Sequence, residues 1–224
     1  FDYSVESMEN LIYDKNGLGV IAGHPWFQNY WSRDTFTTLM GMIEAGMFEE
    51  SREILKNFAQ RDDFPSKIQT NGGTVTTYPR CDTVPLFALA VEKLDRHSDV
   101  SEELLKRAKE LLEENRPQRE VVEHDTAGTW MDTLEREKSI EIQAEWIAAL
   151  NRFDKETEKL TQGMERFEKE DYLRDNLGDD FESINPALAM MLYPFEEEKA
   201  EEYLEKINGE FSSRYGARTR SVTD

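Results

Sequence analysis

The 224-residue sequence has few of the residue types on which disulfide, metal and redox chemistry depend. It contains a single cysteine, Cys81, so no disulfide can form within the chain. A reducing cytoplasm is the simplest setting for it, although a secreted protein without disulfides would show the same composition. The three histidines, His24, His97 and His124, are scattered rather than spaced as zinc ligands. The sequence has no glycine-rich phosphate loop and no dinucleotide fingerprint, so we expect neither a metal nor a cofactor.

Long apolar runs and positive charge are also scarce. No segment approaches the roughly 18 apolar residues of a membrane-spanning helix, and no signal-peptide pattern opens the chain. Acidic residues outnumber basic residues by 47 to 27, which gives a net charge of −20. Nucleic acids and anionic membranes are polyanions, so we expect neither as a partner. The acids lie mainly on helix-like segments such as 196–206, where a solvated helix face explains them; adaptation to high salt is the alternative, against which the many lysines argue.

The pattern that dominates the chain is helical. Apolar residues at helical spacing predict helices at 49–60, 84–94, 101–115, 140–153, 156–173, 185–193 and 196–207. Ser101 is placed as an N-cap, and short turn-forming segments separate the helices. One extended piece is possible at 72–78, and no fixed-period repeat is found. The sequence therefore predicts an all-α fold, either an α-solenoid or an α/α toroid, between which the pattern does not choose.

The segment 22–42, AGHPWFQNYWSRDTFTTLMGM, has an unusual concentration of aromatic residues next to a charged pair, Arg33 and Asp34. Trp26, Phe27, Tyr30 and Trp31 all lie within nine residues of Asp34. Aromatic faces stack on the C–H face of a sugar, while arginine and aspartate bind hydroxyl groups through charge-assisted hydrogen bonds. The segment therefore predicts one wall of a sugar pocket. The simpler interpretation is that a serine or aspartate caps the following helix and that Arg33 pairs with a surface acid.

Two further segments contain carboxylates near aromatic residues. In 128–146, Asp132 follows Trp130 by two residues, and a carboxyl packed against an indole has a raised pKa that suits a general acid. An exposed loop aspartate is the alternative. Glu141 and Gln143 at the start of the next helix either reach the same cavity or cap and solvate that helix.

In 76–87, Tyr78 and Asp82 precede a helix. An N-cap role alone would explain Asp82. Cys81 beside it reads as a small buried hydrophobic residue, because no cysteine–histidine pair is evident.

These motifs together resemble a known family. HPWFQNYWSRDTF, YPRCD, GTWMDT…IEIQAEW and YGARTRS occur in this order, which is similar to the amylo-α-1,6-glucosidase portion of glycogen debranching enzymes. The resemblance runs from about Gly19 to Ser221; the first and third motifs are specific, and the other two are weak by themselves. More distantly, 31–35 is similar to the sugar-binding signature of glucoamylases. The resemblance implies an all-α (α/α)6 toroid that forms one catalytic domain over 1–224, with its active site in loops at one end.

The resemblance also implies an activity. The family hydrolyses the α-1,6-linked glucose at a glycogen branch point with inversion and without a metal, so the expected partner is glycogen or a related α-glucan and the expected setting is cytoplasmic glycogen catabolism. Carried over to this sequence, Asp132 would be the general acid. Arg33 and Asp34 would hold the glucose, and the substrate-binding set would be Trp26, Phe27, Trp31, Arg33, Asp34, Tyr78, Asp82, Trp130, Glu141 and Gln143.

Some features depart from this pattern. The loop between the TWMD and EIQ motifs is shorter than we expect. An inverting hydrolase needs a second carboxylate roughly 6.5–9.5 Å from the acid. In the resembled family this base follows the YGARTRS motif, and the predicted helices are fewer than the twelve of a toroid. The chain also begins with Phe1 rather than methionine. We therefore expect it to be a piece of a longer protein whose C-terminal segment supplies the base and the last helices.

Two other functions stay open at this point. The chain could belong to a glucoamylase-like or trehalase-like toroid glycosidase, or it could be a non-catalytic carbohydrate-binding or helical scaffold fragment.

Overall fold

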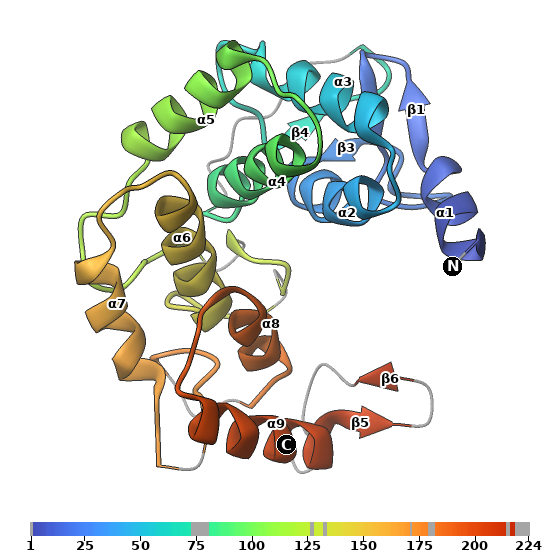
Figure 1. The fold of residues 1–224 in the computed structure, drawn as a ribbon. Coiled ribbons are helices and arrows are strands. Elements are labelled where there is room, and N and C mark those ends of the chain that lie inside the picture. The colour runs from blue at the N-terminus through green and yellow to red at the C-terminus, as the bar shows by residue number, and fades with distance from the viewer. Residues whose placement is uncertain are drawn as a thin grey trace. The chain divides into compact units, whose positions relative to one another are not determined.

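The computed structural model describes residues 2–72, 81–125, 128–131, 134–170, 172–178, 182–213 and 216–217. The chain divides into two compact units, Phe1–Asn115 and Arg116–Asp224, each of which is described by itself. Both are built mainly from α-helices, which confirms the all-α class (Figure 1). Within the described ranges, no helix combines the length and the apolar character needed to cross a membrane.

The first unit packs its helices around an aromatic core. Its elements in chain order are α1 (Asp2–Glu9), β1 (Ile12–Asp14), β2 (Leu18–Val20), β3 (Tyr30–Trp31), α2 (Ser32–Glu44), α3 (Phe48–Ala59), β4 (Lys67–Ile68), α4 (Thr83–His97) and α5 (Glu102–Glu114). Helix α4 packs against α2 and α5. The ring of Phe36 on α2 lies 4.9 Å from that of Phe58 and 5.4 Å from that of Phe87, between ring centroids. These contacts bring the first turns of α2 and α4 together.

Two short antiparallel ribbons complete the first unit. β1 pairs with β2, and β3 pairs with β4 through Tyr30 opposite Ile68 and Trp31 opposite Lys67. The second ribbon leads directly into α2, so it fixes the direction in which the aromatic segment enters that helix.

The second unit is arranged around a buried helix, α6 (Ile140–Arg152), which packs against α7 (Glu158–Met164) and α8 (Asn185–Leu192). A 3₁₀ turn, η2 (Glu165–Phe167), continues α7, and α9 (Glu197–Phe211) leads to the ribbon of β5 (Ser212–Ser213) and β6 (Gly216–Ala217). Ten of the thirteen residues of α6 are buried, including the polar Glu141 and Gln143. The helix therefore takes polar groups into the interior, where they need partners.

Most helix predictions are confirmed. Six of the predicted helices correspond to α3, α4, α5, α6, α8 and α9, and the Ser101 hydroxyl caps α5 by accepting the Leu104 N–H at 3.3 Å. The helix predicted at 156–173 is shorter than expected, because α7 and η2 end at Phe167 and Glu168 then pairs with Leu173 in an isolated bridge. Most of the extended piece predicted at 72–78 lies outside the described residues.

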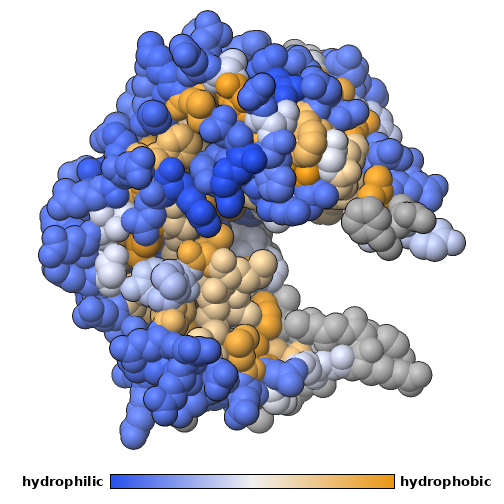
Figure 2. Space-filling view, viewed as in Figure 1, coloured by the Kyte–Doolittle hydropathy of each residue, from blue (hydrophilic) through white to orange (hydrophobic). Residues whose placement is uncertain are grey.

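The acidic segments behave as solvated helix faces. On α9, Glu201, Glu202 and Glu205 are exposed while Tyr203 is buried. Figure 2 shows hydrophilic residues over the outward face of this helix. The charge of these segments is thus explained by their exposure.

Candidate functional site

The aromatic segment of the first unit is displayed on a tight loop. Gly23 and Phe27 exchange two backbone hydrogen bonds, of 3.1 and 2.9 Å, which close the loop before β3. Trp26 is 83% exposed at its tip, and Phe27 is exposed beside it. Because the loop already holds these rings at the surface, a sugar could stack on their faces without a rearrangement of the backbone. Trp31 differs, since it is half-buried and the Lys67 ammonium lies 4.7 Å from its ring centroid.

Arg33 forms an ion pair with Asp82, and this contact joins the starts of α2 and α4. The Arg33 Nε donates to Asp82 Oδ2, and Asp82 is only 2% exposed. Next to it, the Ser32 and Thr83 hydroxyls lie 2.9 Å apart. The structure therefore places Asp82, expected near a sugar pocket, in direct contact with Arg33.

The N-cap interpretation of this region is wrong. Asp82 occupies the N-cap position of α4, but its side chain makes no capping hydrogen bond. The first turn of α2 likewise has no side-chain cap, because Ser32 is already inside the helix and turned toward Thr83. Asp34 lies in that first turn with its side chain exposed. Arg33 thus pairs with a buried acid rather than with a surface acid.

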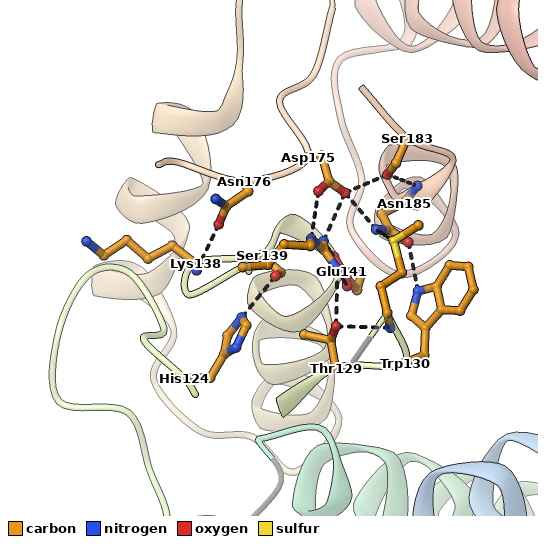
Figure 3. A network of polar contacts seen from close by, with 12 residues as sticks. His124, Thr129, Trp130, Lys138, Ser139, Glu141, Asp175, Asn176, Ser183 and Asn185 are labelled. Carbon is orange, nitrogen blue, oxygen red and sulfur yellow. Dashed lines mark hydrogen bonds and ion pairs between the residues drawn. The ribbon is translucent and has the colours of Figure 1, made fainter. Parts of the chain in front are cut away.

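A buried ion network occupies the second unit (Figure 3). Arg136, which is 1% exposed, donates to both oxygens of Glu141, at 2.8 and 2.7 Å. The same guanidinium contacts Asp175, with Nη2 2.9 Å from Oδ1 and Nε 2.7 Å from Oδ2. One cation therefore faces two carboxylates within the interior.

The electrostatics of this network follow from burial. Burial raises the pKa of Glu141 to about 7, against the opposing effect of Arg136. Burial likewise raises the pKa of Asp175. For Arg136, burial acts to lower the pKa, but its bonds to the two carboxylates outweigh that effect and raise the pKa. The arginine consequently stays charged, and Glu141 can exchange a proton near neutral pH.

Asn185 connects this network to Trp130. Asn185 Nδ2 donates to Asp175 Oδ1 at 2.6 Å, and its Oδ1 accepts the Trp130 indole N–H at 2.7 Å. Trp130 is 38% exposed, so part of its ring faces solvent while its N–H is held (Figure 3). Asp132, the predicted general acid, and Tyr78 lie outside the described residues.

Comparison with known proteins identifies the family. The model of the amylo-α-1,6-glucosidase family matches residues 4–223. The chain belongs to the amylo-α-1,6-glucosidase family. The resemblance predicted from the motifs is therefore confirmed, and the chain is of glycoside hydrolase type. Comparison with the curated proteins gives no significant match.

Solved structures described as glycosidases share the fold of this amylo-α-1,6-glucosidase family member. A wild-type glycosidase structure matches with a TM-score of 0.67 at 11% sequence identity, covering 100% of this chain and 72% of the other. A glycosidase variant in complex with glucose matches with a TM-score of 0.70 at 10% identity and the same coverage. These matches, together with the helical content, support the predicted class of an all-α toroid.

In this amylo-α-1,6-glucosidase family member, the two polar residues predicted on α6 face the interior. Both ends of the Gln143 side-chain amide are bonded within the fold. Its Oε1 accepts the Val122 N–H at 2.9 Å. Its Nε2 donates to the carbonyls of Glu120 and Leu160, at 2.7 and 2.6 Å. Glu141 is held by Arg136. Because both side chains are buried, the interpretation that they solvate the helix is wrong. A sugar could bind either group only by replacing these bonds, and their contact with substrate stays a prediction.

Sequence reasoning missed Arg136, Asp175 and Asn185. Arg136 and Asp175 lie in loops without hydrophobic periodicity, 39 positions apart, so nothing local indicates that they pair. Asn185 begins α8 in an Asn-Pro pair, which signals a helix start and no more. Among the residues that the structure describes, no group of histidine, cysteine, aspartate and glutamate side chains is arranged to hold a metal ion.

Proposed function

We propose that the chain contributes the sugar-binding aromatic wall and the proton donor of an α-1,6-glucosidase that releases glucose from branch points of a glycogen-like glucan. The reaction is inverting and independent of metal, and it serves glycogen breakdown in the cytoplasm. Family membership supports the reaction class. The observation that carries the assignment of the acid is that Asp132 follows Trp130, whose indole N–H is fixed by the buried network.

In this reaction Asp132 donates its proton to the glycosidic oxygen as the bond between that oxygen and the glucose C1 breaks. Water attacks C1 from the opposite face and loses a proton to a second carboxylate, as an inverting reaction requires. General acid catalysis of this kind contributes about 10²- to 10⁴-fold to the rate. In the first unit, we expect a glucan to stack on Trp26 and Phe27, with Arg33 donating hydrogen bonds to its hydroxyl oxygens and Asp34 accepting them from its hydroxyls.

Replacement of the acid tests this proposal. In the full-length protein, Asp132→Asn should lower glucose release from an α-1,6-branched limit dextrin by about 10² or more, because an amide cannot donate the proton. Binding of the dextrin should persist. The matched control is Glu135→Gln, which makes the same carboxyl-to-amide change at an exposed position of the same loop and should leave turnover unchanged.

Normal turnover of Asp132→Asn would remove Asp132 from the mechanism. The same assay on maltosyl and trehalose substrates separates the alternatives. Preference for the α-1,6 branch supports the debranching activity, whereas faster release from maltose or trehalose would indicate a glucoamylase-like or trehalase-like enzyme.

A further inference from the structure

Three successive residues directly before Asp132 are bonded to the same buried network. Thr129 Oγ1 accepts from Arg136 Nη1 at 3.2 Å. The Trp130 indole N–H donates to Asn185 Oδ1 at 2.7 Å, and Met131 Sδ accepts from Asn185 Nδ2 at 3.0 Å. Two network residues therefore hold three consecutive side chains of this loop (Figure 3).

The backbone of the same loop is fixed as well. The Met131 N–H donates to Thr129 Oγ1 at 3.2 Å, and the Leu134 N–H donates to the Met131 carbonyl at 3.1 Å. Arg136, two residues after Leu134, is itself part of the network. The chain is thus held on both sides of the predicted acid.

Asp175 is the centre on which these bonds converge. Its Oδ1 accepts from Arg136 Nη2 at 2.9 Å, from Ser183 Oγ at 2.6 Å and from Asn185 Nδ2 at 2.6 Å. Arg136 in turn bridges to Glu141 at the start of α6. The network therefore joins the loop before α6, the loop before α8 and the first turn of α6 itself.

Fold stability alone does not account for this arrangement. A buried ion network contributes little net stability compared with well-packed apolar residues, because its charges lose their hydration. It does impose one geometry, since each bond fixes direction as well as distance. The fixed part includes the partly exposed ring of Trp130, the one member that can also meet a ligand.

From these contacts we infer that Arg136, Asp175 and Asn185 are positioning residues for the general acid: they orient the Trp130 indole and the backbone of residues 129–131 so that Asp132 meets the glycosidic oxygen. This inference rests on the proposed role of Asp132. A misplacement of about 1 Å at a reacting group can cost about 10²-fold in rate, so positioning of this kind is large enough to measure.

The test compares Asn185→Leu with Asn176→Ala in the full-length protein. Asn185→Leu keeps the number and branching of the side-chain heavy atoms but removes the bonds to Trp130, Met131 and Asp175, while the bond between Arg136 and Asp175 can remain. Asn176 is a buried asparagine of the same region whose Oδ1 accepts the Lys138 N–H at 3.0 Å, so its replacement controls for general loss of a buried amide.

For Asn185→Leu we expect kcat on the limit dextrin to fall by about 10²-fold, with a much smaller change in KM. The alkaline limb of the pH profile, which reports the ionisation of the acid, should also move, because a displaced acid meets different surroundings. Asn176→Ala should keep the parent pH profile.

A second variant covers the case in which Asn185→Leu does not fold. Trp130→Phe keeps an aromatic ring but removes the N–H donor together with part of the indole, and we expect the alkaline limb to move in the same direction. With 5-fluorotryptophan incorporated, Trp130→Phe also identifies the ¹⁹F resonance of Trp130, which should shift or broaden in Asn185→Leu and stay in place in Asn176→Ala.

The outcomes separate this inference from the proposed function. If Asp132→Asn is inactive but Asn185→Leu and Trp130→Phe retain the parent kcat and pH profile, the positioning role is overturned while the acid is retained. If Asp132→Asn is fully active, the proposed function fails, whatever the ¹⁹F spectrum shows.

Discussion

Arg33 and Arg136 each place a guanidinium against buried carboxylate, one in each unit. Arginine suits this role because its planar group binds carboxylates with fixed geometry and stays charged. Removing one partner of such a pair costs about 3–5 kcal/mol when the pair is fully buried, because a charge is left without compensation. The Asp82 and Asp175 carboxylates are therefore expected to be as important to the fold as to the site.

At the residue scale, Trp26 offers the clearest test of sugar stacking. Its side chain is exposed, so Trp26→Ala should leave the melting temperature nearly unchanged. Aromatic stacking contributes about 0.5–1.5 kcal/mol, so the variant should bind maltooligosaccharides roughly 2- to 12-fold more weakly. Isothermal titration calorimetry measures this directly.

Tyr3→Ala is the matched control, because Tyr3 is equally exposed but lies on α1. Equal affinity of the parent, Trp26→Ala and Tyr3→Ala would show that Trp26 does not contact the glucan.

At the scale of elements, the sequence predicts what is local and misses what is not. Helix α5 follows from a serine cap and leucines at helical spacing, and both signals lie within the segment. The helix predicted at 156–173 extends beyond the end of α7 and η2, because 168–173 contains good helix formers, whereas Glu168 and Leu173 pair in an isolated bridge. The two- and three-residue strands are too short to show alternation.

In the candidate site, too, local features can be read from the sequence, whereas contacts between distant segments cannot. The concentration of aromatic residues that includes Trp26 and Phe27 is visible in the sequence, whereas the exposure of these two rings comes from the structure. The partner of Arg33 could not, because Asp82 lies 49 positions away and meets it only when α2 packs against α4. The network of Arg136 and Asp175 is likewise a product of tertiary packing.

Helix packing at α7 gives a prediction at this scale. A Cβ on Gly163 would lie 1.8 Å from the Glu120 carbonyl oxygen and 2.8 Å from Gln143 Nε2, so it would break the contact that Gln143 makes there. Gly163→Ala should therefore lower the free energy of unfolding by about 3 kcal/mol, as measured by urea denaturation.

Gly209 on α9, unlike Gly163, has room for a side chain. No heavy atom of the described residues lies within 4 Å of the position its Cβ would take on α9, and the change should stabilise the protein by up to about 1 kcal/mol. If Gly163→Ala were as stable as the parent, the close packing of α7 against residue 120 would be wrong.

At the scale of the whole molecule, the buried network predicts how stability changes with pH. The pKa of Glu141 is raised by burial from 4.5 to about 7, so the folded protein keeps a proton that the unfolded chain releases. The free energy of unfolding should fall as pH rises from about 4.5 to about 7. The raised pKa of Asp175 acts in the same direction from lower pH.

Glu141→Gln should flatten this dependence, since an amide does not titrate. Urea denaturation at several pH values measures the slope, and Glu135→Gln controls for the loss of one exposed acid from the same loop. A slope in Glu141→Gln equal to that of the parent would place the titrating group elsewhere.

Asp132 is proposed to protonate the leaving glycosidic oxygen in an inverting reaction. The most direct test is ¹H NMR of the first glucose anomer that the full-length protein releases from an α-1,6-branched limit dextrin. We expect β-glucose from the parent and from Glu135→Gln, and no release above background from Asp132→Asn. Initial release of α-glucose, or unchanged release by Asp132→Asn, would contradict it.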